Sequence, residues 1–442
     1  MYRSGHVTRV ELLLTADIHH RHVLLGQLLR LRSLHDPRYP TTPYHDPMRR
    51  LLDVFLIFLR LGLTSFGGPV AHLGYFRTEF VERRRWLDEA AYADLVALCQ
   101  FLPGPASSQV GMALGISRAG LWGALAAWAG FTLPSAALLV AFAYGVGLVG
   151  DVSDAGWLRG LKIVAVAIVA QAVLGMSRTL TPDRPRVLIA LGAAMAALLV
   201  PSAAAQVGII VVAGLIGWRF LTMADAPRAS ALPVTLSRRL GTAFLGAFVA
   251  LLVILPVLRE VVGGPALALM DSFYRAGSLV FGGGHVVLPL LEAEVVPTGW
   301  VTPDAFLAGY GATQAVPGPL FTFSAYLGAV SAVGLPALLA AGLALGAIFL
   351  PSFLLVAGAL PFWNALRAQP GAQSVLRGVN AGVVGLLLAA LYSPVFTAGV
   401  RSTGEFAFVL GTFAALEYLK WPVWLVVALS AGMGALVWAG GP

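Results

Sequence analysis

Long apolar stretches fill most of the chain from residue 51 onward, and charged residues gather in the short segments between them. A helix needs about 20 residues to cross the apolar core of a bilayer. Candidate stretches, the third and eighth of them short, occupy 120–149, 158–178, 187–200, 203–222, 240–257, 334–363, 376–397, 405–418 and 422–440. This pattern predicts an all-α protein that crosses the membrane many times.

Other apolar pieces are too short to cross a membrane alone. These are 51–66, 69–82 and the segments on either side of Pro103-Gly104-Pro105. We expect such pieces to form broken or re-entrant helices, with full spanning as the alternative. Counting each hairpin once gives about thirteen hydrophobic elements.

The chain contains an internal repeat. Arg60-x-Gly62-x-x-x-Phe66-Gly67-Gly68 recurs 215 positions later as Arg275-x-Gly277-x-x-x-Phe281-Gly282-Gly283. Gln100-x-x-Pro103-Gly104-Pro105 recurs 214 positions later, Leu133-Pro134-Ser135 recurs 217 positions later, and Leu158-Arg159-Gly160 recurs 218 positions later. Chance similarity between apolar sequences does not keep Arg, Gln and Pro-Gly-Pro in this order, so we interpret the chain as a tandem duplication.

The charges of the loops indicate how the two copies are oriented. The copy-one loop with Arg83-Arg84-Arg85 corresponds to a loop from Glu292 to Asp304 that has no basic residue. The acidic segment 151–156 corresponds to one that carries Arg367, and the basic loop 178–186 corresponds to one with a single arginine. Because arginine-rich loops stay in the cytoplasm, the two copies are predicted to be inverted, which is a transporter architecture.

Composition excludes a soluble protein. The chain is 58% hydrophobic and 11% charged, against about 25% charged residues in soluble domains. The formal charge of +8 rests almost wholly on arginine, which we assign to cytoplasmic loops rather than to nucleic-acid binding. The single cysteine, Cys99, excludes intrachain disulfides and a cysteine-based metal site.

Four domains follow from these patterns. Residues 1–47 hold six of the eight histidines and are expected to be a basic cytoplasmic tail, either disordered or upstream of a true start at Met48. Residues 48–222 form repeat one, 223–265 a basic cytoplasmic loop and linker helix, and 266–442 the inverted repeat two. On this topology the N-terminus is cytoplasmic and the C-terminus periplasmic.

The paired glycine and proline motifs predict helix breaks inside the membrane. Glycine allows the backbone to leave the helix, and proline suits the first turn of the next one. A helix that starts within the membrane presents free N–H groups and a positive dipole end, which suit an anion. Simple kinks for close packing are the alternative.

Several polar residues accompany these breaks. Arg60 and Arg275 lie in apolar runs. A charge inside the membrane costs free energy, so an arginine there suggests a functional role. The alternative is that each side chain extends to the membrane interface. His72 and His285 follow the Phe-Gly-Gly motifs and are the candidates for coupling proton movement to transport. The predicted substrate-binding residues are Arg60, Phe66, Gly67, Gly68, Pro69, Gln100, Pro103, Gly104, Pro105, Arg275, Phe281, Gly282, Gly283, Gly284, Gln314, Pro317, Gly318 and Pro319.

The combined motifs resemble the chromate ion transporter family in its long two-domain form. They are Phe-Gly-Gly-Pro, Trp86 and Gln100-x-x-Pro-Gly-Pro, repeated as Phe-Gly-Gly-Gly-His, Trp300 and Gln314-x-x-Pro-Gly-Pro. The resemblance covers about residues 48–440 and implies export of chromate from the cytoplasm and chromate resistance. Copy two departs from the motif with Gly284 where copy one has Pro69, so the half-sites need not be equivalent.

The sequence leaves two alternative functions and argues against enzymes and ATP-driven pumps. A transporter of another oxyanion such as sulfate and an anion channel are the alternatives. No His-Glu-x-x-His, Gly-x-Ser-x-Gly or Walker motif occurs, so we expect neither an enzyme nor an ATP-driven pump, and no cofactor or metal. The expected partners are the lipid bilayer of the inner membrane and chromate or a related oxyanion, and a homodimer is left open.

Overall fold

The computed structural model describes residues 46–149, 155–221, 236–281, 284–363 and 369–438. Within these ranges the chain forms helices and no strands. The tail with its histidine cluster, the loop 222–235, Gly282 and Gly283 lie outside the described residues.

Repeat one runs from α2 to α8. Its elements are α2 (Pro47–Thr64), α3 (Gly68–Arg77), the π-helical η1 (Thr78–Arg83), α4 (Glu89–Phe101), α5 (Ala106–Val149), α6 (Gly156–Leu180), α7 (Arg184–Leu199) and α8 (Ala203–Phe220). The linker helix α9 (Arg238–Val261) follows. Ala119 and Gly120 leave helical geometry, so α5 is two helices in series, the second matching the predicted stretch 120–149.

Repeat two runs from α10 to α19. Its elements are α10 (Pro265–Ser278), η2 (Gly284–Val286), α11 (Val287–Val295), α12 (Pro303–Ala315), η3 (Leu320–Thr322), α13 (Phe323–Val330), α14 (Ala337–Ala359), η4 (Leu360–Phe362), α16 (Pro370–Ala390), η5 (Leu391–Phe396), α17 (Thr397–Gly399), α18 (Thr403–Glu417) and α19 (Val423–Val437). By length and composition, six helices of the described part can cross a membrane, namely α5, α6, α8, α9, α14 and α16. The predicted all-α architecture of two inverted repeats with broken helices is confirmed.

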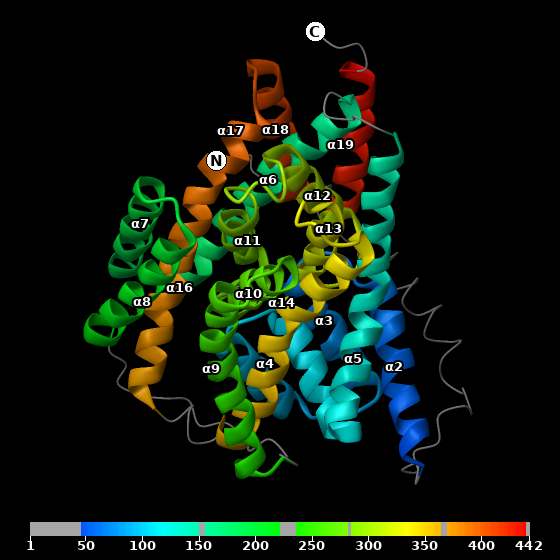
Figure 1. Cartoon of the computed structure of the whole chain (residues 1–442), viewed down its shortest axis with the longest axis vertical. Helices are drawn as coiled ribbons and strands as arrows, with labels where there is room; N and C mark the ends of the chain where they lie inside the picture. Colours follow the sequence, from blue (N-terminus) through cyan, green and yellow to red (C-terminus); the bar gives the residue numbers. More distant parts are fainter. Residues whose placement is uncertain (1–45, 150–154, 222–235, 282–283, 364–368, 439–442) are drawn as a thin grey trace, which may run out of the picture. The chain divides into compact units, whose positions relative to one another are not determined.

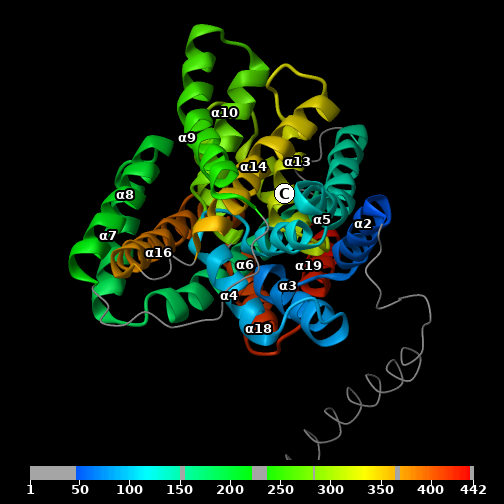
Figure 2. The same cartoon turned by 90° about the horizontal axis from the view of Figure 1, so that it is seen from below.

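The two repeats exchange helices with each other. The repeat-one pair α7 and α8 packs on α16 of repeat two, and the repeat-two pair α18 and α19 packs on α6 of repeat one (Figure 1). Figure 2 shows the first group, α7, α8 and α16, side by side from a second direction. Each repeat therefore completes its packing with helices of the other.

Small residues allow this exchange at equivalent positions. A side chain at Gly160 would overlap the backbone of Ser430 in α19, and one at Gly378 would overlap the backbone of Ala213 and Gly217 in α8. Such close backbone approach is how membrane helices associate without a hydrophobic driving force. The equivalent pair of crossings shows that the duplication preserved this packing.

Ion pairs also join α6 to repeat two. The Lys162 ammonium lies 2.9 Å from an Asp304 oxygen, and Arg178 lies 2.8 Å from Glu417. Arg159 pairs with the buried carboxylate of Glu405. Lys162 itself is buried, so its pairing with Asp304 compensates a charge that lipid would otherwise oppose.

We expect Gly378→Ala to destabilise the protein. The new methyl group would enter the crossing of α16 with α8, at a cost on the order of 1–3 kcal/mol for overpacking. The measurement is the melting temperature of the purified protein in detergent, with Gly192→Ala of α7 as the control because no atom lies within 4 Å of its added methyl group. Equal melting temperatures for both variants would contradict the tight crossing.

Candidate functional site

In repeat one the predicted helix breaks occur at the glycines of both motifs. α2 ends at Thr64, and Gly67 just before α3 and Gly68 at its first position take left-handed φ values of 96° and 76°. Gly104 has a φ of 125° between the end of α4 and the start of α5. Only glycine adopts these angles without strain, so the sequence fixes where each helix stops.

In repeat two the described residues show the break at the second motif. Gly318 has a φ of 106° between the end of α12 and η3, and α10 ends before Phe281. After each break in the described part, a new helical segment begins. The starts of α3, α5, η2 and η3 therefore present backbone N–H groups that lack partners within their own helix.

The breaks of the two repeats are bonded to each other. The Gly104 N–H donates to the Val280 carbonyl at 2.6 Å, and the Gly318 N–H donates to the Ser65 carbonyl at 2.9 Å. Gly104 and Gly318 are equivalent in the repeat, as are Ser65 and Val280. Each Pro-Gly-Pro segment thus meets the residue that precedes the Phe-Gly-Gly motif of the other repeat. We call the region of residues 65–69, 103–105, 280–281, 284 and 317–319 the break crossing.

Contacts across the break crossing require small residues. A methyl group at Gly104 would overlap the Ser352 hydroxyl and lie 2.6 Å from Gln109 Nε2. A methyl group at Gly318 would lie 2.7 Å from the hydroxyl of Ser135, which is equivalent to Ser352. These paired contacts follow the pseudo-twofold relation of the repeats.

The unequal motif residues Pro69 and Gly284 face each other. A methyl group at Gly284 would lie 3.1 Å from Pro69 Cγ. Because the two equivalent positions meet, a proline ring on one side leaves room only for a small residue on the other. This contact gives a steric reason for the departure of copy two from the motif.

The two candidate histidines occupy different surroundings. His72 is buried, with Nδ1 3.3 Å from the Ser107 hydroxyl and Nε2 3.2 Å from the Ser65 carbonyl. His285 Nδ1 lies 2.7 Å from the Tyr310 hydroxyl. His72 therefore touches the break crossing directly, and proton coupling by either residue stays a prediction.

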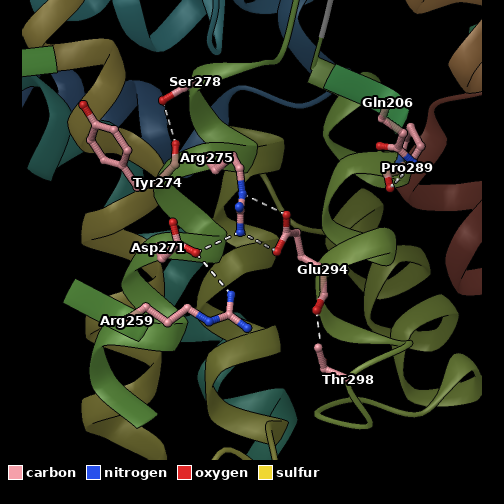
Figure 3. A network of polar contacts seen from close by, with 9 residues as sticks. All are labelled: Gln206, Arg259, Asp271, Tyr274, Arg275, Ser278, Pro289, Glu294 and Thr298. Carbon is pink, nitrogen blue, oxygen red and sulfur yellow. Dashed lines mark hydrogen bonds and ion pairs between the residues drawn. The ribbon is translucent and has the colours of Figure 1, made fainter. Parts of the chain in front are cut away.

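The two candidate arginines are not alike. Arg60 lies on the exposed side of α2, and the structure does not bring its side chain to the breaks. Arg275 binds two buried carboxylates, 2.9 Å from Asp271 and 3.1 Å from Glu294 (Figure 3). Arg259 of the linker helix also reaches Asp271, at 3.1 Å. Arg275 is thus neutralised within a four-residue network, and the assignment of both arginines to substrate stays a prediction.

The remaining predicted residues divide between the crossing and its edges. Gln100 is exposed at the end of α4, whereas Gln314 has a buried Nε2 without a hydrogen-bond partner in the described part.

Phenylalanines and prolines of the motifs contact side chains outside the motifs. The Phe66 ring lies 6.2 Å from the ring of Trp424, and Phe281 is partly buried. Pro103 and Pro319 accept hydrogen bonds from Gln109 and Thr322 respectively.

Sequence reasoning missed several polar residues at the crossing. Ser65, Ser108, Gln109, Thr132 and Ser352 are buried, and each has a polar side-chain atom without a partner among the described residues. One signal was present, because Ser352 belongs to the repeated Leu-Pro-Ser motif. The others have different residues in the second copy, so a search for repeated motifs passes over them.

Comparison with known proteins gives a family match in both repeats. Residues 52–218 and 267–435 match the family described as chromate transporter. A chromate transport protein of Pseudomonas aeruginosa is 32% identical over 357 residues, covering 78% of this chain and 82% of that protein. A probable chromate transport protein of Synechococcus elongatus is 26% identical, covering 89% of this chain and 97% of that protein. A chromate transport protein of Cupriavidus metallidurans is 26% identical, covering 78% and 82%. No solved structure matches the chain.

Proposed function

This chain belongs to the chromate transporter family, and from this premise we propose that it is a secondary transporter that exports chromate from the cytoplasm. The observation that carries the proposal is the break crossing, where two inverted repeats bring helix starts together. Helix starts inside a membrane suit an anionic group, and inverted repeats place such a site near the midplane. The names of three relatives support chromate as the anion.

The conformation described here suits an occluded step of transport. Ser65, His72 and Gln109 at the crossing are at most 1% exposed. An anion can reach them only if the two repeats move relative to each other. Inverted repeats provide such movement, because each can open the site to one side of the membrane.

Placement in the inner membrane follows from the same proposal. The basic loops of repeat one and the linker would face the cytoplasm, with the N-terminus cytoplasmic and the C-terminus periplasmic. The repeat boundaries at 48–222 and 266–442 fit this topology. Export would then lower cytoplasmic chromate and confer resistance, without catalysis by the chain itself.

The test uses inverted membrane vesicles that contain the protein, beside vesicles that lack it. Inversion turns export into uptake, so labelled chromate should accumulate when a potential is imposed that is positive inside the inverted vesicles. Unlabelled sulfate in excess should compete poorly. Right-side-out vesicles with the same protein content provide the control for direction.

Each outcome separates one function from another. Chromate uptake in inverted vesicles alone supports export. Equal uptake of sulfate would assign the transporter to oxyanions in general, and rapid two-way flux at rates far above those of carriers would indicate a channel. Vesicles that move neither anion would refute the proposal.

A further inference from the structure

Four buried hydroxyl groups at and beside the break crossing have no hydrogen-bond partner in the described part of the chain. They belong to Ser65, Ser108, Thr132 and Ser352, which are at most 2% exposed. Buried polar groups are almost always bonded, and each unmet one destabilises the fold. Such a group therefore calls for an explanation, and a ligand that supplies the missing bonds is one.

The duplication shows that the fold does not need the hydroxyls of Ser65 and Thr132. Ser65 is equivalent to Val280, and Thr132 to Phe349. In the same backbone arrangement, repeat two places apolar side chains where repeat one keeps polar ones. His72 and Gln109 follow this pattern, since their equivalents are Val287 and Phe323. A purely structural role would not explain why these four positions are polar in repeat one alone.

Two further equivalent pairs differ in their bonding. The Thr322 hydroxyl, equivalent to that of Ser108, donates to the Pro319 carbonyl at 2.8 Å. The Ser135 hydroxyl, equivalent to that of Ser352, donates to the Thr132 carbonyl at 3.0 Å. In each pair one hydroxyl donates a hydrogen bond within the protein, and the other has no hydrogen-bond partner among the described residues.

Two of these four hydroxyls, those of Ser108 and Ser352, belong to residues that lie at the start of α5. Ser352, which is fully buried, contacts the position of Gly104 immediately before α5, and Ser108 lies on the first turn of that helix. The first N–H groups of α5 and its positive dipole end lie at the same place. Donors from a helix start and from side chains of both repeats thus converge on one region.

We propose that the transported oxyanion is bound at the break crossing by these uncharged donors, the hydroxyls of Ser65, Ser108, Thr132 and Ser352 with the start of α5, and not by arginine. The inference rests on the proposed function and adds the ligands to it. Arg275 is already neutralised by Asp271 and Glu294, and Arg60 is exposed. A tetrahedral oxyanion has four oxygens that accept hydrogen bonds, which matches a set of donors without acidic groups.

The test compares Ser108→Ala and Ser352→Ala with Thr322→Val and Ser135→Ala. All four variants remove one buried hydroxyl at equivalent positions, but only the second two break a bond that the protein makes itself. Initial rates of chromate uptake into inverted vesicles give KM for each, and the melting temperature in detergent gives stability. We expect KM to rise about tenfold in Ser108→Ala and Ser352→Ala, because each loses a bond to an anion.

A structural role predicts the opposite order. The variants that break an existing bond, Thr322→Val and Ser135→Ala, would then lose more stability and more transport activity than Ser108→Ala and Ser352→Ala. That order, or an unchanged KM in both Ser108→Ala and Ser352→Ala while the wild type transports chromate, would overturn the inference. Failure of the wild type to transport any oxyanion would instead refute the proposed function.

Discussion

Replacing Gly104 by alanine should reduce transport by about tenfold or more while the protein still reaches the membrane. The φ of 125° is strained for any residue with a side chain, at a cost on the order of 1–3 kcal/mol. The new methyl group would also overlap the Ser352 hydroxyl and press on Gln109. Any shift of the backbone at Gly104 also weakens the bond of its N–H to the Val280 carbonyl, which joins the two repeats at the crossing.

Uptake of chromate into inverted vesicles, scaled to the amount of protein, checks this expectation. Gly318→Ala should behave in the same way, since its φ is 106° and its methyl group would press on Ser135. Gly346→Ala of α14 is the matched control, because its methyl group meets no atom within 4 Å. If Gly104→Ala and the control transport equally well, the breaks are kinks without a role in transport.

A loss of stability is the expected result for Asp271→Asn. Asp271 is buried and compensates Arg259 and Arg275 at 3.1 and 2.9 Å. The amide keeps the shape but removes the charge, which leaves both guanidinium groups with Glu294 as the only carboxylate of the network. Breaking a buried pair in this way costs about 3 kcal/mol, and the melting temperature should fall by several degrees.

A second substitution distinguishes lost charge balance from general damage. Adding Arg259→Gln to Asp271→Asn leaves the Arg275–Glu294 pair balanced, so part of the lost stability should return. Glu82→Gln is the control, since its pair with Arg77 is exposed and contributes at most about 1 kcal/mol. A double variant no more stable than Asp271→Asn would refute the electrostatic account of the network.

The helix breaks could be predicted from sequence because they depend on local chemistry. Glycine at Gly67, Gly104 and Gly318 and the flanking prolines determine backbone geometry wherever they occur. The repeat then predicted that the breaks come in pairs, and the structure joins Gly104 to Val280 and Gly318 to Ser65. The inversion followed from loop charge, which depends on the membrane rather than on packing.

The side-chain partners and the helix crossings could not be predicted from the sequence, because they depend on segments far apart in the chain. Arg60 and Arg275 are equivalent in the repeat, yet the fold brings Glu294 of α11 to Arg275 and leaves Arg60 exposed. The exchange of α6 and α16 between repeats depends on side-chain fit at Gly160 and Gly378, which apolar periodicity does not show. The lack of hydrogen-bond partners for the Ser108 and Ser352 hydroxyls also depends on the positions of their neighbours in the fold.

Locating the bound oxyanion would distinguish binding by hydroxyl groups at the break crossing from binding by arginine. Crystals of the protein grown with chromate, measured near the chromium absorption edge, would show the metal centre of the anion as an anomalous peak. We expect one peak at the break crossing, with the Ser108 and Ser352 hydroxyls directed at the oxygens of the anion. A peak at Arg60 or Arg275, with the crossing empty, would contradict it.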